Sequence, residues 1–314
     1  MDFLTHLVFG SLIYLLSLRE ITLDYFVIAV IFSILPDLDI FLAPFRRFIK
    51  SNYLEHRGGS HSFIIGILIS LLISLLTSLF TPYPFYLVWI IGSLFYGLHV
   101  SMDLLTTTNI PYLFPLSKKE HSFYVEKAGS MFTFITSIIF IFLPIVMFRF
   151  FGGMLYFQFY LNFFTYFFIS YYLYRIISRI YVSTTLEKGQ KYLPGILPFY
   201  FRIFSYEING NEIIYSIKKK SHFSKKTETI RVSTILSTQE ESFLSMAKEI
   251  TNNHYYYAKW TLLPVFIRSE GMFSIKFFFL ETMMRKRTMF IQYDFNTETH
   301  DLISSTQKSG PIQN

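Results

Sequence analysis

Seven histidine and aspartate side chains among the first 103 residues stand out as candidate ligands of divalent metal ions. Four are histidines and three are aspartates: His6, Asp37, Asp39, His56, His61, His99 and Asp103. Imidazole nitrogen and carboxylate oxygen are common ligands of zinc and related ions. The chain contains no cysteine, so thiolate ligands and disulfide bonds are excluded. The residue types therefore predict a divalent metal site built from histidine and carboxylate.

The pair His99 and Asp103 carries the strongest local signal. A spacing of four residues places both side chains on one face of a helix, where they can share a metal ion. Ionisable groups in an apolar helix are costly and usually face a protein interior or a water-filled cavity. The alternative is that the pair only forms hydrogen bonds between helices, and ligation of a metal is the preferred interpretation.

Asp37 and Asp39 follow Pro36 at the end of an apolar run. Pro-Asp sequences are also common in solvated turns, so the motif by itself is weak. Beside the histidines, it predicts that at least one of the two aspartates binds the metal. The other is expected either to bridge a second ion or to orient a histidine. In catalysis, Asp37 or Asp39 would orient or deprotonate a water molecule.

His56 and His61 flank a Gly-Gly turn. The glycines allow a close backbone approach, and Ser60 or Ser62 can cap the helix that follows. Arg57 could clamp an anionic oxygen of a substrate through a bidentate contact, which would make it a catalytic residue. With equal weight, Arg57 could form a salt bridge or add positive charge to a cytoplasmic loop.

The remaining candidates are weaker. A histidine such as His6 is by itself more typical of a membrane interface, and only its place at the start of an apolar run adds it to the site. Glu120, His121 and Glu126 follow the fourth apolar run. They either complete the site or lie at the surface.

The apolar runs must position these side chains. Hydrophobic residues make up 52% of the chain and charged residues only 16%, against about 25% charged residues in soluble domains. Six runs are predicted to span a bilayer, the first two being short for a span: 7–18, 25–36, 63–80, 85–105, 131–151 and 155–178. The predicted fold is mainly α, a multi-spanning transmembrane bundle of about six helices over residues 1–190.

Loop charge predicts the orientation of this bundle. Basic residues are concentrated in segments 38–62, 118–127 and 175–191 and are scarce in the alternate turns. Basic loops stay in the cytoplasm, so we expect a multi-pass protein of the cell membrane with both termini cytoplasmic. All seven candidate ligands then lie at the cytoplasmic ends of the helices. Orientation also accounts for the net charge of +7, and no nucleic acid partner is expected.

Residues 191–314 differ in composition and predict a small cytoplasmic α+β domain. Runs with interleaved apolar residues predict strands at 201–208, 212–218, 255–263, 272–280 and 289–295. A turn is expected at Asn209-Gly210. A capping box of Thr238 and Glu241 predicts a helix that ends near Ile250. A polar tail follows Ser304.

The motifs together resemble those of the YdjM-type membrane-bound metal-dependent hydrolases, a family described as LexA-regulated. The resemblance covers residues 1–116 through Thr5-His6, Leu-Pro-Asp-Leu-Asp, His-Arg-Gly-Gly-Ser-His-Ser and His99-x3-Asp103. The family is distantly similar to zinc-dependent phospholipase C, in which a comparable set binds a zinc cluster that cleaves phosphodiesters. Two positions depart from the family pattern. Many relatives have threonine in place of Ser60, and many have a glutamate soon after the pair that is Gly129-Ser130 here, so this chain could hold fewer ions.

The resemblance implies that the seven candidate residues form the metal site of a hydrolase, with zinc as the expected divalent metal. The expected substrate is a phosphoester, such as a phospholipid of the surrounding bilayer. The alternative is a non-catalytic membrane scaffold, in which the metal is structural and the soluble domain binds a partner. A transporter is disfavoured, because its polar residues would lie near the bilayer midplane rather than at one side.

Overall fold

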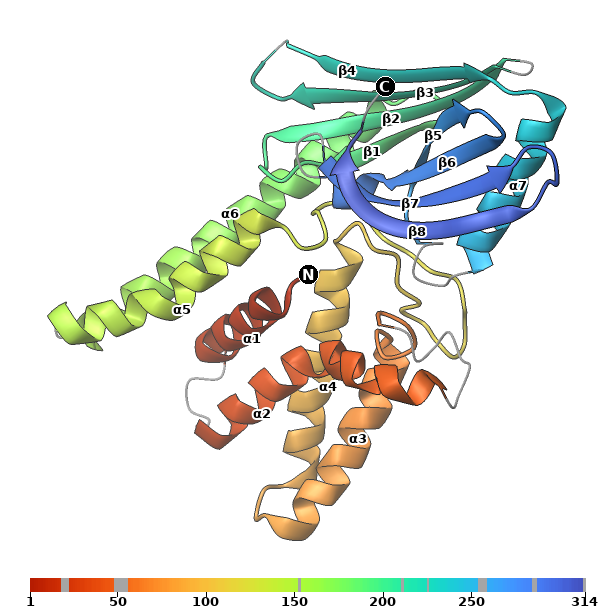
Figure 1. The fold of residues 1–314 in the computed structure, drawn as a ribbon. Helices are drawn as coiled ribbons and strands as arrows, with labels where there is room; N and C mark the ends of the chain where they lie inside the picture. Colours follow the sequence, from red (N-terminus) through yellow and green to blue (C-terminus); the bar gives the residue numbers. More distant parts are fainter. Residues whose placement is uncertain are drawn as a thin grey trace. The chain divides into compact units, whose positions relative to one another are not determined.

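The computed structural model describes residues 1–17, 23–47, 56–151, 154–209, 212–224, 226–253, 259–283 and 287–312. The chain forms two compact units, Met1–Ser178 and Arg179–Asn314. The first unit is helical and the second is built mainly from strands (Figure 1).

The first unit is organised around a central helix. In chain order its elements are α1 (Phe3–Ser17), α2 (Leu23–Ile34), the 3-10 helix η1 (Leu35–Arg47), α3 (Phe63–Phe80), α4 (Phe85–Leu104), α5 (Met131–Phe151) and α6 (Met154–Thr184), whose last turns belong to the second unit. Helices α3 and α4 form a hairpin, and α4 also packs against α1, α2 and η1 (Figure 1). Residues from four separate segments therefore meet on α4.

Helices α1 and α2 approach each other closely at Gly10. A Cβ atom at this position would lie 2.4 Å from Ser33 Oγ, a distance that real Cβ contacts do not show. Glycine is the residue that permits such an approach of two backbones. The contact brings the end of α2, including the Ser33 carbonyl, next to the face of α1 that carries His6.

The prediction of a six-span bundle is wrong. Within the described residues, only α3 and α4 are both long and apolar enough to cross a bilayer. Helix α1 has 15 residues and α2 has 12; at about 1.5 Å per residue, both fall short of a hydrocarbon core of about 30 Å. The apolar stretch of α5 that the structure describes is also short, and α6 contains Gln158, Asn162 and many tyrosines.

The second unit consists of two four-stranded antiparallel sheets linked by one helix. Its elements are β1 (Gln190–Pro194), β2 (Tyr200–Asn209), β3 (Glu212–Ser221), β4 (Glu228–Ile235), α7 (Thr238–Asn253), β5 (Leu262–Ser269), β6 (Met272–Phe279), the 3-10 turn η3 (Leu280–Thr282), β7 (Arg287–Asn296) and β8 (Leu302–Pro311). The strand orders are β1-β2-β3-β4 and β5-β6-β7-β8. With so much of the chain in strands, the fold is not mainly α.

Most of the predicted strands have counterparts in these sheets. Strands β2, β3, β6 and β7 lie where 201–208, 212–218, 272–280 and 289–295 were expected. Gly210 of the predicted turn, and residues 255–258 of the predicted strand at 255–263, lie outside the described residues; β5 begins at Leu262. The segment after Ser304 forms much of β8, paired with β7. Its small polar side chains suit a solvated edge strand.

The capping box of α7 lies one residue earlier than predicted. The Ser237 N–H donates to Glu240 Oε2 at 2.8 Å, and the Glu240 N–H donates to Ser237 Oγ at 3.3 Å. Ser237 therefore satisfies the first orphan donors of the helix, a role that the sequence spacing had given to Thr238 and Glu241.

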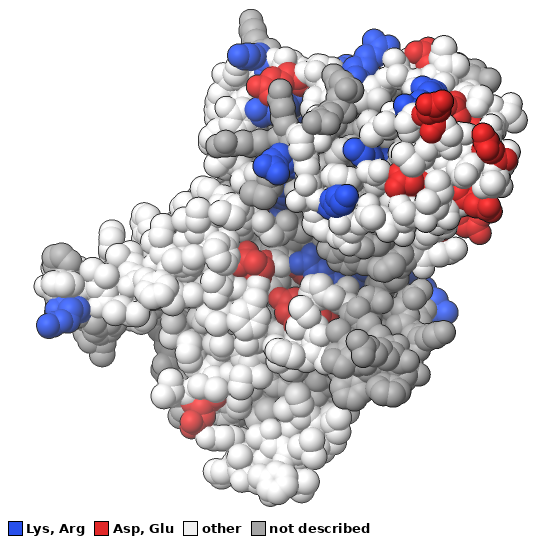
Figure 2. Space-filling view, viewed as in Figure 1, with Lys and Arg blue, Asp and Glu red and all other residues white. Residues whose placement is uncertain are grey.

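Charged side chains are unevenly distributed between the two units. In the view of Figure 2, Lys, Arg, Asp and Glu gather over the C-terminal sheets, whereas the helices of the first unit present mostly uncharged side chains. Many large apolar side chains of α3 are exposed, among them Leu72, Leu79 and Phe80. Such a surface is suited to lipid contact.

Candidate metal centre

Four of the predicted ligands converge at one point. One donor atom each from Asp37, His61, His99 and Asp103 lies within 4.8 Å of all the others. The Nε2 atoms of His61 and His99 are 3.3 Å apart, and His61 Nε2 lies 3.3 Å from Asp103 Oδ2 and 3.5 Å from Asp37 Oδ1. A tetrahedron with metal–ligand bonds of about 2.1 Å has edges of about 3.4 Å, so the spacing fits one ion.

Three segments bring these donors together. His99 and Asp103 lie one turn apart at the end of α4, as their spacing predicted. His61 immediately precedes α3, where Ser62 is the N-cap and accepts a hydrogen bond from Ile64 N–H. Asp37 comes from the first turn of η1. Ser62 also donates to the carbonyl of Phe114, which ties the start of α3 to the loop after α4.

The hydrogen bond of His99 fixes which ring nitrogen faces the centre. Its Nδ1 lies 2.8 Å from the Ser33 carbonyl oxygen. A carbonyl only accepts, so Nδ1 must carry the proton, and in a neutral ring Nε2 then presents a lone pair. This lone pair is directed at the other three donors, which is the arrangement that metal-binding histidines use.

His61 is fixed by a chain of two hydrogen bonds. Ser60 Oγ donates to Asp39 Oδ2 at 2.6 Å, and His61 Nδ1 lies 3.0 Å from the same hydroxyl. Because the serine proton is directed at the carboxylate, the hydroxyl accepts from His61 Nδ1. The Nε2 lone pair of His61 therefore also faces the centre.

Asp39 acts as the anchor of this arrangement and is not one of the four converging donors. Its Oδ1 lies 2.6 Å from His56 Nδ1, and its Oδ2 accepts from Arg57 N–H at 3.0 Å. Burial alone would raise the pKa of Asp39, but the hydrogen bonds with His56 and His61 outweigh it and hold the pKa well below the usual range. His56 is thus bound to the anchor rather than to the centre.

Asp37 is the ligand with access to solvent. Its side chain is 10% exposed, whereas those of the other three donors are fully buried. Burial tends to raise its pKa, but the interactions with the His61 and His99 imidazoles outweigh burial, so the pKa of Asp37 lies well below the usual range. Asp37 is therefore ionised and ready to bind a cation.

The two oxygens of Asp103 have different environments. Oδ1 contacts the Met1 amino group and lies 3.3 Å from His6 Nε2. Oδ2 is buried and accepts no hydrogen bond from the described residues. A buried ionised oxygen that accepts no hydrogen bond is costly inside a protein. Arg57 Nε lies 3.5 Å from Oδ2 without forming a hydrogen bond, and a metal ion bound between Oδ2, His61 and His99 would stabilise this oxygen further.

His6 lies beside the four donors. Its ring stacks on that of His99, with 3.6 Å between centroids and 18° between planes. Its Nε2 lies 3.3 Å from Asp103 Oδ1, and His6 is not one of the four residues whose donor atoms converge. The structure therefore places His6 as a neighbour that supports both His99 and Asp103.

Arg57 is held by the protein on three sides. Its guanidinium donates to Thr108 Oγ1 and to the Met1 carbonyl, each at 2.7 Å, and its Nε lies 3.5 Å from Asp103 Oδ2. Its backbone is left-handed, with φ of 61°. Of the two roles left open by the sequence, the salt bridge is the one seen here, and the charge offsets the nearby carboxylates.

The three acidic and histidine candidates after α4 lie outside the cluster. Glu126 is fully buried and pairs with Arg175 of α6, with Nε and Oε2 3.0 Å apart; Tyr171 also donates to this oxygen. His121 pairs through its backbone with Ile110. Glu126 is thus neither a surface residue nor a ligand, but the link between the loop and α6.

Sequence spacing did not reveal the residues that orient the histidines. The Ser33 carbonyl carries no side-chain signal, and Ser60 was expected only as a helix cap. The role of Ser60 could have been predicted from one signal. A metal-binding histidine usually donates its second ring N–H to a nearby polar group, and Ser60 is the residue before His61.

Comparison with known proteins identifies a family, and the match covers the first unit and little of the second. A family model described as YdjM inner membrane protein matches residues 1–181, which span every candidate ligand. No curated protein and no solved structure matches the chain. The likeness to zinc-dependent phospholipase C therefore rests on the motifs only.

Proposed function

Because this chain belongs to the YdjM inner membrane protein family, we propose that it is a membrane-bound hydrolase that works with a divalent metal ion, zinc, at this centre. The observation that carries the proposal is the convergence of two imidazole nitrogens and two carboxylate oxygens, one of them a buried oxygen without a hydrogen bond. Two nitrogens and two oxygens suit zinc among the common ions.

The residues of the chain divide the work of such a hydrolase. When bound, a divalent ion activates water and polarises an ester. His61, His99 and Asp103 hold the ion from buried positions, and Ser33, Ser60 and Asp39 keep the two rings in place. Asp37 is the donor nearest solvent, so we assign it the orientation of the attacking water and the acceptance of its proton.

The place of the centre suggests a substrate at the membrane surface. The ligands lie at the end of the α3–α4 hairpin opposite its connecting turn, which is the uncharged segment 81–84. Exposed Lys118 and Lys119 lie in the loop next to α4. By the positive-inside rule this end is cytoplasmic, and its positive charge would attract a phosphoester such as an anionic phospholipid.

A structural role for the metal is the rival function, and one observation favours it. Structural zinc sites are closed by four protein ligands, whereas catalytic sites leave one position to water. Four protein donors converge here. The protein would then be a membrane scaffold whose metal holds α4, η1 and the start of α3 together.

Elemental analysis and a hydrolysis assay on the same purified protein separate these functions. We expect about one zinc ion per chain and release of water-soluble glycerol phosphate from phosphatidylglycerol vesicles, with diacylglycerol left in the bilayer. Asp37→Asn should abolish hydrolysis and retain most of the metal, since the other three donors remain. Asp103→Asn should lose both hydrolysis and bound metal. His222→Ala, in the second unit, should keep the hydrolysis and the metal content of the wild type.

The outcomes are distinct for each function. Zinc bound tightly by the wild type, with no glycerol phosphate released from vesicles and no p-nitrophenol released from bis(p-nitrophenyl) phosphate, would favour the scaffold. Protein that never holds a transition metal would contradict both functions.

A further inference from the structure

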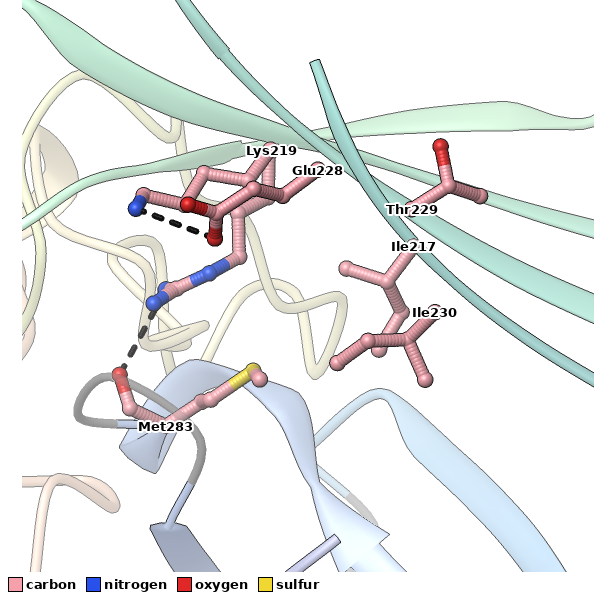
Figure 3. A pocket seen from close by; sticks show the side chains of 7 residues that line it. Ile217, Lys219, Glu228, Thr229, Ile230 and Met283 are labelled. Carbon is pink, nitrogen blue, oxygen red and sulfur yellow. Dashed lines mark hydrogen bonds and ion pairs between the residues drawn. The ribbon is translucent and has the colours of Figure 1, made fainter. Parts of the chain in front are cut away.

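Two cavities among the described residues of the second unit have linings that differ in charge. The first, of about 280 Å³, lies on strands β2, β3 and β4 (Figure 3). Its polar groups are matched within the protein: Lys219 Nζ lies 3.3 Å from Glu228 Oε2, and Arg202 donates to the Met283 carbonyl. A cavity with matched charges does not demand an ionic ligand.

The second cavity, of about 380 Å³, lies between the two sheets and α7. Its size falls in the range of small-molecule sites. Most of its lining is aromatic or aliphatic, with two lysines: Gly189, Lys191, Phe204, Tyr206, Tyr215, Lys248, Leu262, Pro264 and Phe277.

The apolar wall is fixed by strand register. Tyr206 of β2 pairs directly with Tyr215 of β3, with ring centroids 4.8 Å apart. Phe204 stacks on the same Tyr215 ring at 6.2 Å. On the other sheet, Pro264 of β5 is the partner of Phe277 of β6. Side chains fixed by two sheets form a preformed surface for an apolar ligand.

Of the two lysines, Lys191 has its charge met inside the protein. Its Nζ donates to Thr261 Oγ1 at 2.6 Å and lies 3.6 Å from Glu281 Oε1. Glu281 is itself buried and accepts two further hydrogen bonds from Thr261. This network links β1 to the end of β6 and leaves the Lys191 charge balanced.

Lys248 of α7 differs from Lys191. Its side chain is half-buried, and within the described residues it forms no salt bridge and no hydrogen bond. Burial lowers the pKa of Lys248, and no nearby charge counteracts it. A partly buried cation in a mainly apolar lining is unfavourable unless an anion balances its charge.

We propose that this cavity binds a small amphipathic anion, with its apolar body against Phe204, Tyr215 and Phe277 and a single carboxylate on Lys248. The site is independent of the metal centre, because all its residues belong to the second unit. One unmatched cation favours a monoanion. A phosphate monoester carries nearly two charges and would need a second cation, which Lys191 does not offer because Glu281 holds it.

Calorimetric titration of the full chain in lipid nanodiscs tests the proposal, with empty nanodiscs subtracted. The probe is 4-phenylbutyrate, compared with its uncharged amide and with phenyl phosphate. We expect the carboxylate to bind more tightly than both. Lys248→Gln should weaken binding of the carboxylate by about tenfold or more and leave binding of the amide unchanged, since only the charge-assisted hydrogen bond is removed.

Two further variants complete the test. Lys248→Arg keeps the charge and should retain most of the affinity, and Lys308→Gln removes an exposed charge on β8 and should change nothing. Thermal unfolding followed through Trp260 checks that each variant is folded. Equal binding of carboxylate and amide, tighter binding of phenyl phosphate, or no binding by the folded wild type would overturn the proposal.

Discussion

At the scale of single residues, the centre is defined by where lone pairs point. The Ser33 carbonyl and the Ser60 hydroxyl fix the protons of His99 and His61 on their outer nitrogens. Two lone pairs and the oxygens of Asp37 and Asp103 then face one another within a few ångströms. Such a group of acceptors repels itself unless a cation lies between them.

The first prediction at this scale concerns the anchor. Asp39→Asn keeps the size of the side chain but replaces an acceptor-only carboxylate with an amide that can direct a donor at Ser60. The tautomer of His61 is then no longer fixed, and metal affinity should fall by about 10- to 100-fold. Competition with a chelating dye measures the affinity.

The exposed Asp301→Asn, in the second unit, is the matched control. If Asp39→Asn binds zinc as tightly as the wild type, Asp39 does not position a ligand.

At the scale of elements, close helix packing brings the ligand segments together. Gly10 of α1 and Gly92 of α4 both lie against the end of α2, at Ser33 and Phe32. The His99 partner is the Ser33 backbone carbonyl, so a displacement of α2 would move the centre directly. Helix packing and metal binding should therefore respond together to mutation.

A pair of substitutions tests this coupling. Gly10→Ala should destabilise the first unit by about 1–3 kcal/mol, because the new methyl group overlaps the Ser33 side chain. Ser33→Gly removes that side chain and keeps the carbonyl, so the double variant should recover part of the loss. Thermal unfolding and zinc content are measured on all four proteins.

Additive effects of the two substitutions would contradict the packing explanation. Gly97→Ala, in α4, where the added Cβ would meet only Phe63 at an ordinary contact distance of 3.7 Å, controls for the general effect of replacing a helical glycine.

The start of α7 gives a pH-dependent prediction. Arg268 donates to Glu240 at 2.6 Å, and this hydrogen bond lowers the pKa of Glu240 below its usual value of about 4.3. Because the pKa of Glu240 is lower in the folded state than in the unfolded state, the ionised carboxylate stabilises the folded state at pH values above the usual pKa. This contribution is lost as the pH falls through the folded-state pKa. Glu240→Gln should remove this part of the acid dependence.

Unfolding of the second unit between pH 6 and pH 3 measures the effect. The wild type should lose more stability over this range than Glu240→Gln, and Glu298→Gln, at an exposed turn, should behave as the wild type. Parallel curves for wild type and Glu240→Gln would show that the ion pair contributes nothing.

At the scale of the whole molecule, the two units should respond differently to loss of metal. The ligands all belong to Met1–Ser178, and the sheets lie in Arg179–Asn314. A metal ion that binds only the folded state stabilises that state by about 2.7 kcal/mol when its free concentration is a hundred times its dissociation constant. Chelation should therefore lower the melting temperature of the first unit alone.

The chain provides its own reporters for this experiment. It has two tryptophans, Trp89 in α4 of the first unit and Trp260 just before β5 of the second. Trp260→Phe leaves fluorescence from the first unit, and Trp89→Phe leaves that from the second. Equal shifts of both transitions with chelator, or a shift of neither, would contradict the prediction.

Residue types and their spacing were sufficient to predict which side chains form the candidate site. His61, His99, Asp37 and Asp103 were predicted as ligands from residue type, from the spacing of four on α4 and from their place at helix ends. Helix periodicity is local, so it can be followed along the chain. The YdjM resemblance was confirmed over a longer stretch than its motifs cover.

Which of the seven candidate residues face the centre, and which position the others, became clear only from the tertiary structure. Asp37 and Asp39 are two residues apart in one motif, yet one faces the ligands and the other holds His56, Arg57 and Ser60. Likewise, six apolar runs yielded only two helices of spanning length in the described residues. Which nitrogen carries a proton and where a helix ends depend on partners from distant segments, and composition and periodicity contain no record of those contacts.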